Sequence, residues 1–305
     1  MPDGDKYDAV VVGGGPAGLA GAFWLARYRH RVRLFDAQDP RNKMTWAVHG
    51  YLGLQDVEPL ELRRIARHQA QDAGAELEAA VVERVEGAED DFTVTLSDGR
   101  SVGARRILLA TGLKDIVPEI PGFDDFYGSS IWHCPDCDGP SITGRHVAVI
   151  GWGKKIAAYC MGMLTWAGDL TVLTDGHPAD VEGSALRALE RWGIHVREEE
   201  LARLEGDGGQ VRRVHFHHGP PLDVEAVFFN IASGPGSSIA ADLGCAADED
   251  GILEVDGDHR TTVAGVYAAG DITPGSRLAI RAAAEGTRAA IGIHRSLIPP
   301  ERRLR

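Results

Sequence analysis

YDAVVVGGGPAG, residues 7–18, begins with an apolar run of strand length and passes directly into a Gly-rich turn. An alanine-rich helical stretch follows to about residue 30, and the short apolar run 32–35 ends on Asp36. This order of strand, Gly-x-Gly-x-x-Gly, helix, strand and acid is typical of a dinucleotide-binding βαβ unit, in which Asp36 would accept a ribose hydroxyl. A Gly-rich turn without a ligand is the alternative, and we favour dinucleotide binding because all five parts are present in order.

Each small residue of the turn has a role in such a unit. Gly13 permits the tight turn, Gly15 lets the backbone approach a pyrophosphate, and Gly18 lets the helix pack close to the strand. Pro16 and Ala17 lie at the start of the helix, where the dipole and the backbone N–H groups attract an anion. We therefore predict that these five residues contact the cofactor.

The segment from residue 39 to residue 53 shows little periodicity and carries several groups that can contact a ligand. We expect Asn42 and His49 to lie beside a flavin ring, with His49 as a base. A surface loop with a hydrogen-bonded histidine is the alternative. Beyond it, apolar spacing predicts a helix over residues 58–73, and the next stretch, 76–85, reads as one strand.

A buried strand is predicted over residues 106–112, and it ends in three small residues. Ala110, Thr111 and Gly112 make a turn that lets the chain pass close to a cofactor. We therefore include these three residues in the cofactor site.

The stretch 261–271 reads as a strand near the C-terminus, and it ends in Gly270 and Asp271. Asp271 is placed to accept a hydroxyl from a ribityl chain. An alanine-rich helix follows, and its N-terminus, with Ala279 and Ile280, is expected to face the phosphates or the carbonyl edge of a flavin.

WHCPDCDG, residues 132–139, places Cys134 and Cys137 three residues apart. At a helix start both sulfurs lie on one side with backbone N–H groups pointing toward them, which lowers a thiol pKa. Asp138 follows directly and could carry the proton when a substrate thiolate leaves. His133 could stabilise a thiolate or shuttle protons, and an ordinary hinge residue is the alternative for this position.

Such a cysteine pair serves a redox dithiol, a zinc site or an inert structural link. Zinc needs four ligands, and the two remaining cysteines, Cys160 and Cys245, are single and far off in sequence. We predict a redox dithiol and no metal site.

The bulk composition excludes several classes of protein. A chain of 305 residues suggests about two domains, and 44% hydrophobic with 25% charged residues is ordinary for a globular protein. No apolar run approaches the roughly 18 residues of a membrane span, and the acidic start, residues 1–5, has no apolar signal core. We expect a cytoplasmic protein without a membrane partner, and the net charge of −13 argues against nucleic acid.

Taken in chain order, these motifs resemble those of the low-molecular-weight thioredoxin reductases over nearly the whole chain. The carriers are the Gly-rich turn 13–18, the Ala-Thr-Gly turn, the Cys-x-x-Cys-Asp-Gly segment and VYAAGD at 266–271. The resemblance implies an α/β protein with two Rossmann-like three-layer domains, the second inserted into the first. Residues 1–117 and 251–305 would form a discontinuous FAD-binding domain, and 118–250 a central NAD(P)-binding-like domain with the cysteine pair.

The resemblance also implies chemistry for the cysteines. Cys137 would face the flavin, and Cys134 would attack the disulfide of the substrate through a mixed disulfide. The expected partner is a thioredoxin-like protein or a small disulfide or dithiol. A homodimer is expected from the resemblance alone.

A second βαβ pattern starts with the strand 146–150 and departs from the family pattern. In thioredoxin reductases this is the NADPH site, and the last position of its glycine pattern is normally small, whereas Ile156 stands here. Arginines that read the 2′-phosphate usually follow the second strand, whereas residues 175–180 offer two acids and no arginine. Conventional NADPH use is therefore disfavoured; NADH use and a site without productive nicotinamide binding stay open.

The sequence as a whole predicts an FAD-dependent thiol–disulfide oxidoreductase. Electrons would pass between the flavin and the cysteine pair and on to a protein or small-molecule disulfide, with NAD(P)H use uncertain and ferredoxin as a further donor. The alternatives are a dithiol oxidase that passes electrons to oxygen, a conventional NAD(P)H-dependent thioredoxin reductase, and a flavin-binding sensor without turnover.

Overall fold

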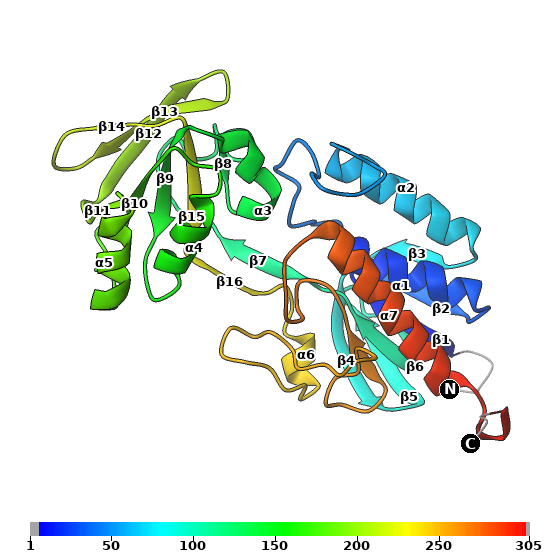
Figure 1. Cartoon of the computed structure of the whole chain (residues 1–305). Coiled ribbons are helices and arrows are strands. Elements are labelled where there is room, and N and C mark those ends of the chain that lie inside the picture. The colour runs from blue at the N-terminus through cyan, green and yellow to red at the C-terminus, as the bar shows by residue number, and fades with distance from the viewer. Residues whose placement is uncertain (1–5, 303–305) are drawn as a thin grey trace. The chain divides into compact units, whose positions relative to one another are not determined.

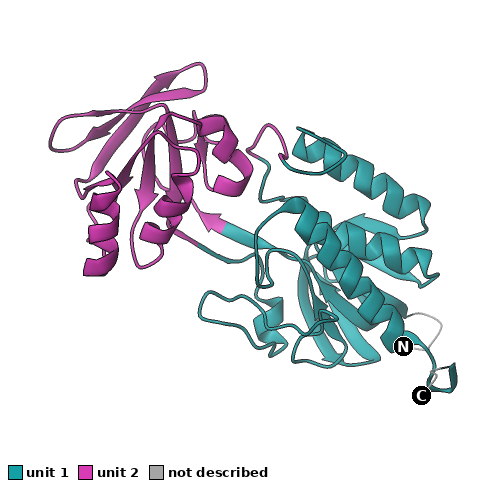
Figure 2. Ribbon diagram, in the orientation of Figure 1, with its two compact units in different colours: residues 1–43, 50–114, 233–305 teal, residues 44–49, 115–232 magenta. Residues whose placement is uncertain are grey.

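The computed structural model describes residues 6–302, so the acidic N-terminal segment used to predict location lies outside the described residues. The chain forms two compact units (Figure 2). Unit 1 takes the chain up to Lys43, Gly50–Lys114 and the chain from Ser233 onward. Unit 2 takes Met44–His49 and Asp115–Ala232. No helix within the described residues is both long and apolar enough to cross a membrane.

Unit 1 contains a seven-stranded sheet in the order β3-β2-β1-β6-β5-β4, with β17 also paired to β6 (Figure 1). Its elements in chain order are β1 (Tyr7–Val12), α1 (Pro16–Arg27), β2 (Val32–Asp36), α2 (Pro59–Asp72), β3 (Glu76–Ala79), β4 (Val82–Ala88), β5 (Asp91–Leu96), β6 (Ser101–Leu109), α6 (Ile239–Asp242), β17 (Val266–Ala268), α7 (Ala279–Leu297) and the 3₁₀ helix η3 (Pro300–Arg302).

Unit 2 contains a five-stranded sheet in the order β11-β10-β9-β15-β8 and a three-stranded sheet β12-β13-β14. Its elements are β8 (Ile131–Trp132), α3 (Pro135–Asp138), the 3₁₀ helix η2 (Gly139–Ile142), β9 (His146–Gly151), α4 (Ile156–Met163), β10 (Asp169–Leu173), α5 (Gly183–Arg191), β11 (His195–Arg197), β12 (Leu201–Asp207), β13 (Gln210–Phe216), β14 (Leu222–Asp223) and β15 (Ala226–Asn230). Where the chain passes between the units, β7 (Leu113–Ile116) pairs with β16 (Ala232–Pro235).

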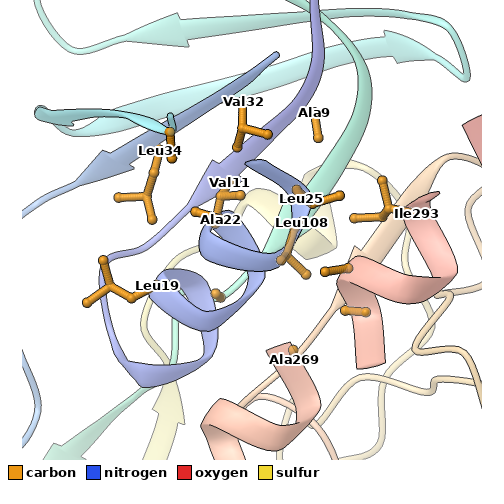
Figure 3. Close-up of a cluster of buried hydrophobic side chains, with 14 of the residues drawn as sticks. Ala9, Val11, Leu19, Ala22, Leu25, Val32, Leu34, Leu108, Ala269 and Ile293 are labelled. Atoms are coloured by element: carbon orange, nitrogen blue, oxygen red, sulfur yellow. The ribbon is translucent and has the colours of Figure 1, made fainter. Parts of the chain in front are cut away.

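Strand β1 is buried on both faces, which explains why its sequence is continuously apolar rather than alternating. Ala9 and Val11 point to the side of α1 and α7, whereas Val10 and Val12 point to the side of β4 and β5. Val11 lies beside Leu34 of β2 and Leu108 of β6 in the parallel register (Figure 3). Unit 1 is therefore built as helices, parallel sheet and antiparallel strands in three layers.

Strand β9 repeats this arrangement in unit 2. Val147 and Val149 face α4 and α5, and Ala148 and Ile150 face the three-stranded sheet. The predicted fold class, two Rossmann-like three-layer α/β domains with the second inserted into the first, is confirmed.

Two predicted strands were wrong in extent. The stretch 76–85 is not one strand: β3 pairs in parallel with β2, whereas β4 pairs antiparallel with β5 at the opposite edge of the same sheet. The sequence hides the break between the two strands because residues 79–82 are all apolar. In the stretch 261–271 only β17 is a strand, because the residues before it form turns.

The packing of the core between α1, α7 and the sheet leads to a prediction about the free energy of unfolding. Leu25 of α1 is fully buried in this core (Figure 3), whereas Leu60 of α2 is 54% exposed. Replacing Leu25 by Ala removes buried methyl groups and leaves a cavity, and should lower the free energy of unfolding by about 2–5 kcal/mol. Leu60→Ala should stay within about 0.5 kcal/mol of the wild type. Urea unfolding followed by far-ultraviolet circular dichroism compares the two, and equal losses would contradict this packing.

Candidate active site

The cysteine pair forms a disulfide, Cys134–Cys137, with its Cα atoms 5.3 Å apart. Strand β8 leads into it, Cys134 precedes the first residue of α3, and Pro135 occupies the first helical position, where its missing N–H costs nothing. The N–H of Cys137 donates to the carbonyl of Cys134 at 3.1 Å, so the two cysteines span a single helical turn. Both side chains are half-buried, which leaves the bond partly accessible.

The other two cysteines take no part in this site. Cys160 and Cys245 are both buried and belong to different units. Burial raises the pKa of the Cys160 thiol to about 12, which keeps it protonated and unreactive. Within residues 6–302 no group of three or more His, Cys, Asp or Glu side chains is arranged to hold a metal ion.

Asp138 lies at the end of α3 and its side chain is only 8% exposed. Burial raises the pKa of its carboxyl to about 6, and the nearby His49 opposes the rise in part. Gly139 explains why the turn can sit so deep, because a Cβ there would lie 2.5 Å from the Trp166 ring. Trp166 was missed by sequence reasoning, since nothing in the motif indicates what packs beneath its glycine.

His133, the residue before the disulfide, lies close to a second carboxylate. Its Nε2 is 3.6 Å from Oδ2 of Asp115, whose side chain is 9% exposed. The hydroxyl of Tyr159 on α4 donates to the carbonyl of His133 at 3.1 Å and fixes the backbone there. The structure thus brings His133 and the disulfide together as predicted from their adjacency, and adds Asp115 and Tyr159, which the sequence did not indicate.

His49 lies with the cysteine turn in unit 2, because the segment Met44–His49 packs there. Its Nε2 is 3.9 Å from Oδ1 of Asp138. Gly128 shows how closely this segment approaches, since a Cβ at that residue would lie 1.7 Å from the carbonyl oxygen of Met44. The predicted neighbour Asn42 stays in unit 1, where it is half-buried.

The Gly-rich turn of unit 1 has the shape of a pyrophosphate cradle. Gly13 has φ +110°, and a Cβ there would lie 2.2 Å from the carbonyl oxygen of Ala110. A Cβ at Gly18 would lie 1.9 Å from the carbonyl oxygen of Gly13, whereas a Cβ at Gly15 would meet open space. Helix α1 begins at Pro16 with no side-chain cap on its N-terminus. The residues present therefore fit the phosphates of FAD at this helix end.

Asp36 is held by two arginines that the sequence reasoning missed. Oδ2 accepts Nη2 of Arg63 at 2.6 Å and Nη1 of Arg67 at 3.0 Å, and Oδ1 accepts the N–H of Gln38 at 3.0 Å. A Cβ at Gly14 would lie 2.3 Å from Cγ of Asp36, so the carboxyl lies directly against the turn. The spacing of the arginines, four residues apart on one face of α2, was the available signal. Oδ1 keeps a lone pair for a ribose hydroxyl.

The remaining predicted cofactor residues also lie in unit 1. Asp271 accepts Nη1 of Arg41 at 2.9 Å, and the N–H of Gly270 donates to Glu285 of α7 at 2.9 Å. Arg41 and Glu285 are further polar residues that no motif indicated. The other predicted residues follow β6 or begin α7: Ala110, Thr111, Gly112, Ala279 and Ile280.

The second glycine segment, in unit 2, closes on itself. The N–H of Gly153 donates to the carbonyl of Ala179 at 2.9 Å. The ring of Trp152 stacks on that of His177, with centroids 3.9 Å apart and planes 18° apart. Thus the Gly153 N–H is already hydrogen-bonded, and the Trp152 ring is already stacked, by residues of the same unit.

Two predicted departures in this segment also have structural consequences. The Ile156 side chain is buried and fills the space beside the first glycine, where a Cβ on Gly151 would lie 2.8 Å from its Cδ1. Asp175 accepts the N–H of Leu201 at 2.7 Å, so this acid is used inside unit 2.

Comparisons with known proteins agree with this arrangement. The profile of the family described as pyridine nucleotide-disulphide oxidoreductase matches residues 7–286. Thioredoxin reductase sirT of Leptosphaeria maculans is 26% identical over 94% of this chain and 93% of its own length. Thioredoxin reductase of Treponema pallidum is 28% identical over 93% of this chain and 95% of its own. The crystal structure of HlmI gives a TM-score of 0.90 at 30% identity, covering 98% of this chain and 94% of that one.

The two arginines that bind Asp36, here called the arginine clamp, lead to a prediction about how tightly FAD is held. Arg63→Met removes one of the two cations on a buried carboxylate and should cost about 1–3 kcal/mol, seen as a lower thermal midpoint and a weaker FAD affinity. The matched control is Arg64→Met, since Arg64 is exposed on the same helix and pairs only with Glu61 in the described structure. That variant should change stability by less than about 1 kcal/mol. Equal effects of the two changes on FAD affinity would refute the clamp.

The buried carboxyl of Asp138 makes a prediction about pH. The folded chain keeps this proton up to about pH 6, whereas the ordinary value is 3.8, so the unfolded chain releases it first. The protonated carboxyl therefore contributes its full share to the free energy of unfolding at acid pH. About 3 kcal/mol of that free energy is lost as the pH rises through 6. Asp138→Asn cannot ionise and should lack this loss, so the difference between variant and wild type should grow between about pH 4 and about pH 7. A difference that stays constant over this range would contradict the raised pKa.

Proposed function

Because this chain belongs to the pyridine nucleotide-disulphide oxidoreductase family, as a thioredoxin reductase-like flavoprotein, we propose that it passes electrons between FAD and Cys134–Cys137. The disulfide would in turn exchange with a disulfide of a thioredoxin-like protein or of a small molecule. The observation that carries the proposal is the half-buried disulfide in one helical turn, followed at once by a buried carboxyl. FAD, when bound, supplies or accepts the two electrons.

We assign FAD to the domain of residues 1–117 and 251–305, and the exchange chemistry to residues 118–250. The phosphates would lie at the start of α1, against Gly13, Gly15, Pro16, Ala17 and Gly18. Asp36 would meet a ribose hydroxyl and Asp271 a hydroxyl of the ribityl chain. The other predicted contacts with the cofactor are Asn42, His49, Ala110, Thr111, Gly112, Gly270, Ala279 and Ile280. The open space at Gly15 and the uncapped start of α1 support this assignment.

The roles of the cysteines are assigned as follows. The Cys134 thiolate attacks a substrate disulfide, the substrate S–S bond breaks, and a mixed disulfide forms while one substrate thiolate leaves. Asp138 protonates the leaving thiolate, for which its raised pKa suits it. Cys137 then attacks Cys134 in the mixed disulfide, which releases the second substrate thiolate and restores Cys134–Cys137. His133 stabilises the thiolate from its place beside the pair.

The same proposal holds that NADPH is not bound in the usual mode. The Gly153 N–H and the Trp152 ring are engaged by residues 177–179, and Asp175 brings an acid where a 2′-phosphate needs cations. Another donor then reduces the protein, such as ferredoxin. A second candidate, favoured by the same closed segment, is a dithiol oxidase: a substrate dithiol reduces Cys134–Cys137, and the electrons leave through FAD to oxygen.

Anaerobic mixing of the FAD-containing protein with single reductants tests the donor. We expect dithiothreitol to bleach the flavin absorbance, because thiol exchange reaches it through the cysteine pair, and NADPH to leave it unchanged. Cys137→Ser is the control, since it should keep FAD and lose bleaching by dithiothreitol.

Three results would contradict the proposal or distinguish the reductase from the dithiol oxidase. Rapid bleaching by NADPH would show that the closed segment opens and that the protein is a conventional thioredoxin reductase. No bleaching by dithiothreitol in the wild type would overturn electron exchange through Cys134–Cys137. Oxygen uptake with a dithiol and no nicotinamide would favour the oxidase over the reductase.

A further inference from the structure

His49 comes from a segment far from the cysteines in sequence but belongs to the same compact unit. The segment Met44–His49 packs in unit 2, and its backbone approaches the turn at Gly128 so closely that a side chain there would collide with Met44. Ala47 and Val48, next to the histidine, are both buried. Such packing holds His49 at a fixed place rather than on a free loop.

Asp138 and His49 lie close together and differ in how far their side chains are exposed to solvent. The carboxyl is 8% exposed and the imidazole 20% exposed, with 3.9 Å between Oδ1 and Nε2. This separation exceeds a hydrogen bond, and a small side-chain rotation would close it. The imidazole as a whole is more exposed to solvent than the carboxyl, although its Nε2 atom, which faces Asp138, is buried.

The other titratable groups around Asp138 cannot take this role. Burial raises the pKa of Tyr159 on α4 well above its ordinary value, and the charges of Asp138, Asp115 and Asp136 reinforce the rise. Tyr159 thus stays a neutral phenol, and Asp136 and Asp115 add negative charge to the surroundings. His133 lies with Asp115 instead. Histidine is the side chain that exchanges protons with solvent near neutral pH.

We propose that His49 is a positioning residue that returns a proton to Asp138 after each disulfide exchange. This inference rests on the proposed function, and it gives His49 a role in the exchange between Cys134 and the substrate disulfide. The Cys134 thiolate breaks the substrate S–S bond, the leaving thiolate takes the proton of Asp138, and Asp138 becomes a carboxylate. The imidazolium of His49 then gives its proton to that carboxylate, becomes neutral, and regains a proton from solvent.

The relay matters only where the leaving thiolate needs a proton. Bis(2-hydroxyethyl) disulfide releases a basic alkyl thiolate, whereas 5,5′-dithiobis(2-nitrobenzoic acid) releases an aryl thiolate that is stable without one. General acid assistance should therefore accelerate the first disulfide and leave the second unchanged. The ratio of the two rates cancels the common step, attack by Cys134.

The experiment mixes protein whose FAD and cysteine pair are both reduced, under anaerobic conditions, with an excess of each disulfide. The protein's two electron pairs allow two successive exchanges per chain, and the rate of the second, which needs Asp138 to have regained its proton, is followed. His49→Gln should slow the alkyl disulfide about tenfold and leave the aryl disulfide unchanged, because general acid catalysis contributes about a hundredfold or more. Asp138→Asn should show the same selectivity, and the double variant should lose no more than Asp138→Asn alone. His68→Gln is the matched control, since His68 is exposed on α2 beside Asp72 at 3.6 Å.

The outcomes separate the inference from the proposed function. Equal slowing of both disulfides by His49→Gln, or no slowing of either, overturns the relay while the exchange chemistry stands. Wild-type protein that reacts with neither disulfide overturns the proposed function itself. If His49→Gln loses FAD, the wild type alone decides: its alkyl-to-aryl rate ratio should fall as the pH rises above about 6, and a flat ratio refutes the relay.

Discussion

A carboxyl group that is largely buried lies one residue after a disulfide whose reduction takes up protons. Charging Asp138 in this place is unfavourable, so it holds a proton into the pH range where thiolates leave. Gly139 has no side chain, so the turn packs directly against Trp166 and Asp138 is buried. Pro135 begins the single helical turn that joins the two cysteines. The segment with His49 places an imidazole 3.9 Å from this carboxyl. Beside the cysteine pair the structure thus brings together a buried carboxyl and an imidazole from distant parts of the chain.

Much of the fold could be predicted because local patterns carry it. Strand, glycine turn and helix follow one another within residues 7–27, and the same order recurs from residue 146, so both βαβ units were predicted from neighbouring residues alone. The stretch 76–85 was misread because its two halves pair at opposite edges of one sheet, and sequence alternation does not tell which edge a strand takes. Long-range pairing decides such cases.

The candidate site shows the same division between local and distant information. The disulfide and Asp138 are contiguous, so the motif predicted their proximity. His49 was expected beside a flavin because its segment carries several groups that can contact a ligand, and only the fold shows that this segment packs in the unit that holds the cysteines. The arginines on Asp36 come from α2, for which the sequence predicted only a helix, and the fold shows that they hold a buried carboxyl.

The two glycine turns share an architecture but differ in what their donors meet. A Cβ would meet open space both at Gly15 in unit 1 and at Gly153 in unit 2, but in unit 2 the N–H of Gly153 donates to the carbonyl of Ala179 and the ring of Trp152 stacks on His177. The two turns therefore differ in hydrogen bonding and ring stacking, and not in the space at the central glycine.

The central claim is that FAD and the Cys134–Cys137 disulfide form one redox system. An anaerobic reductive titration with dithionite tests it most directly, with electrons counted to the end of flavin bleaching and free thiols counted afterwards. A disulfide is a two-electron couple, so the wild type should take up two electrons more per chain than the Cys134→Ser/Cys137→Ser variant and gain two thiols. Equal electron uptake by the two proteins, with the wild-type disulfide still intact, would contradict the account.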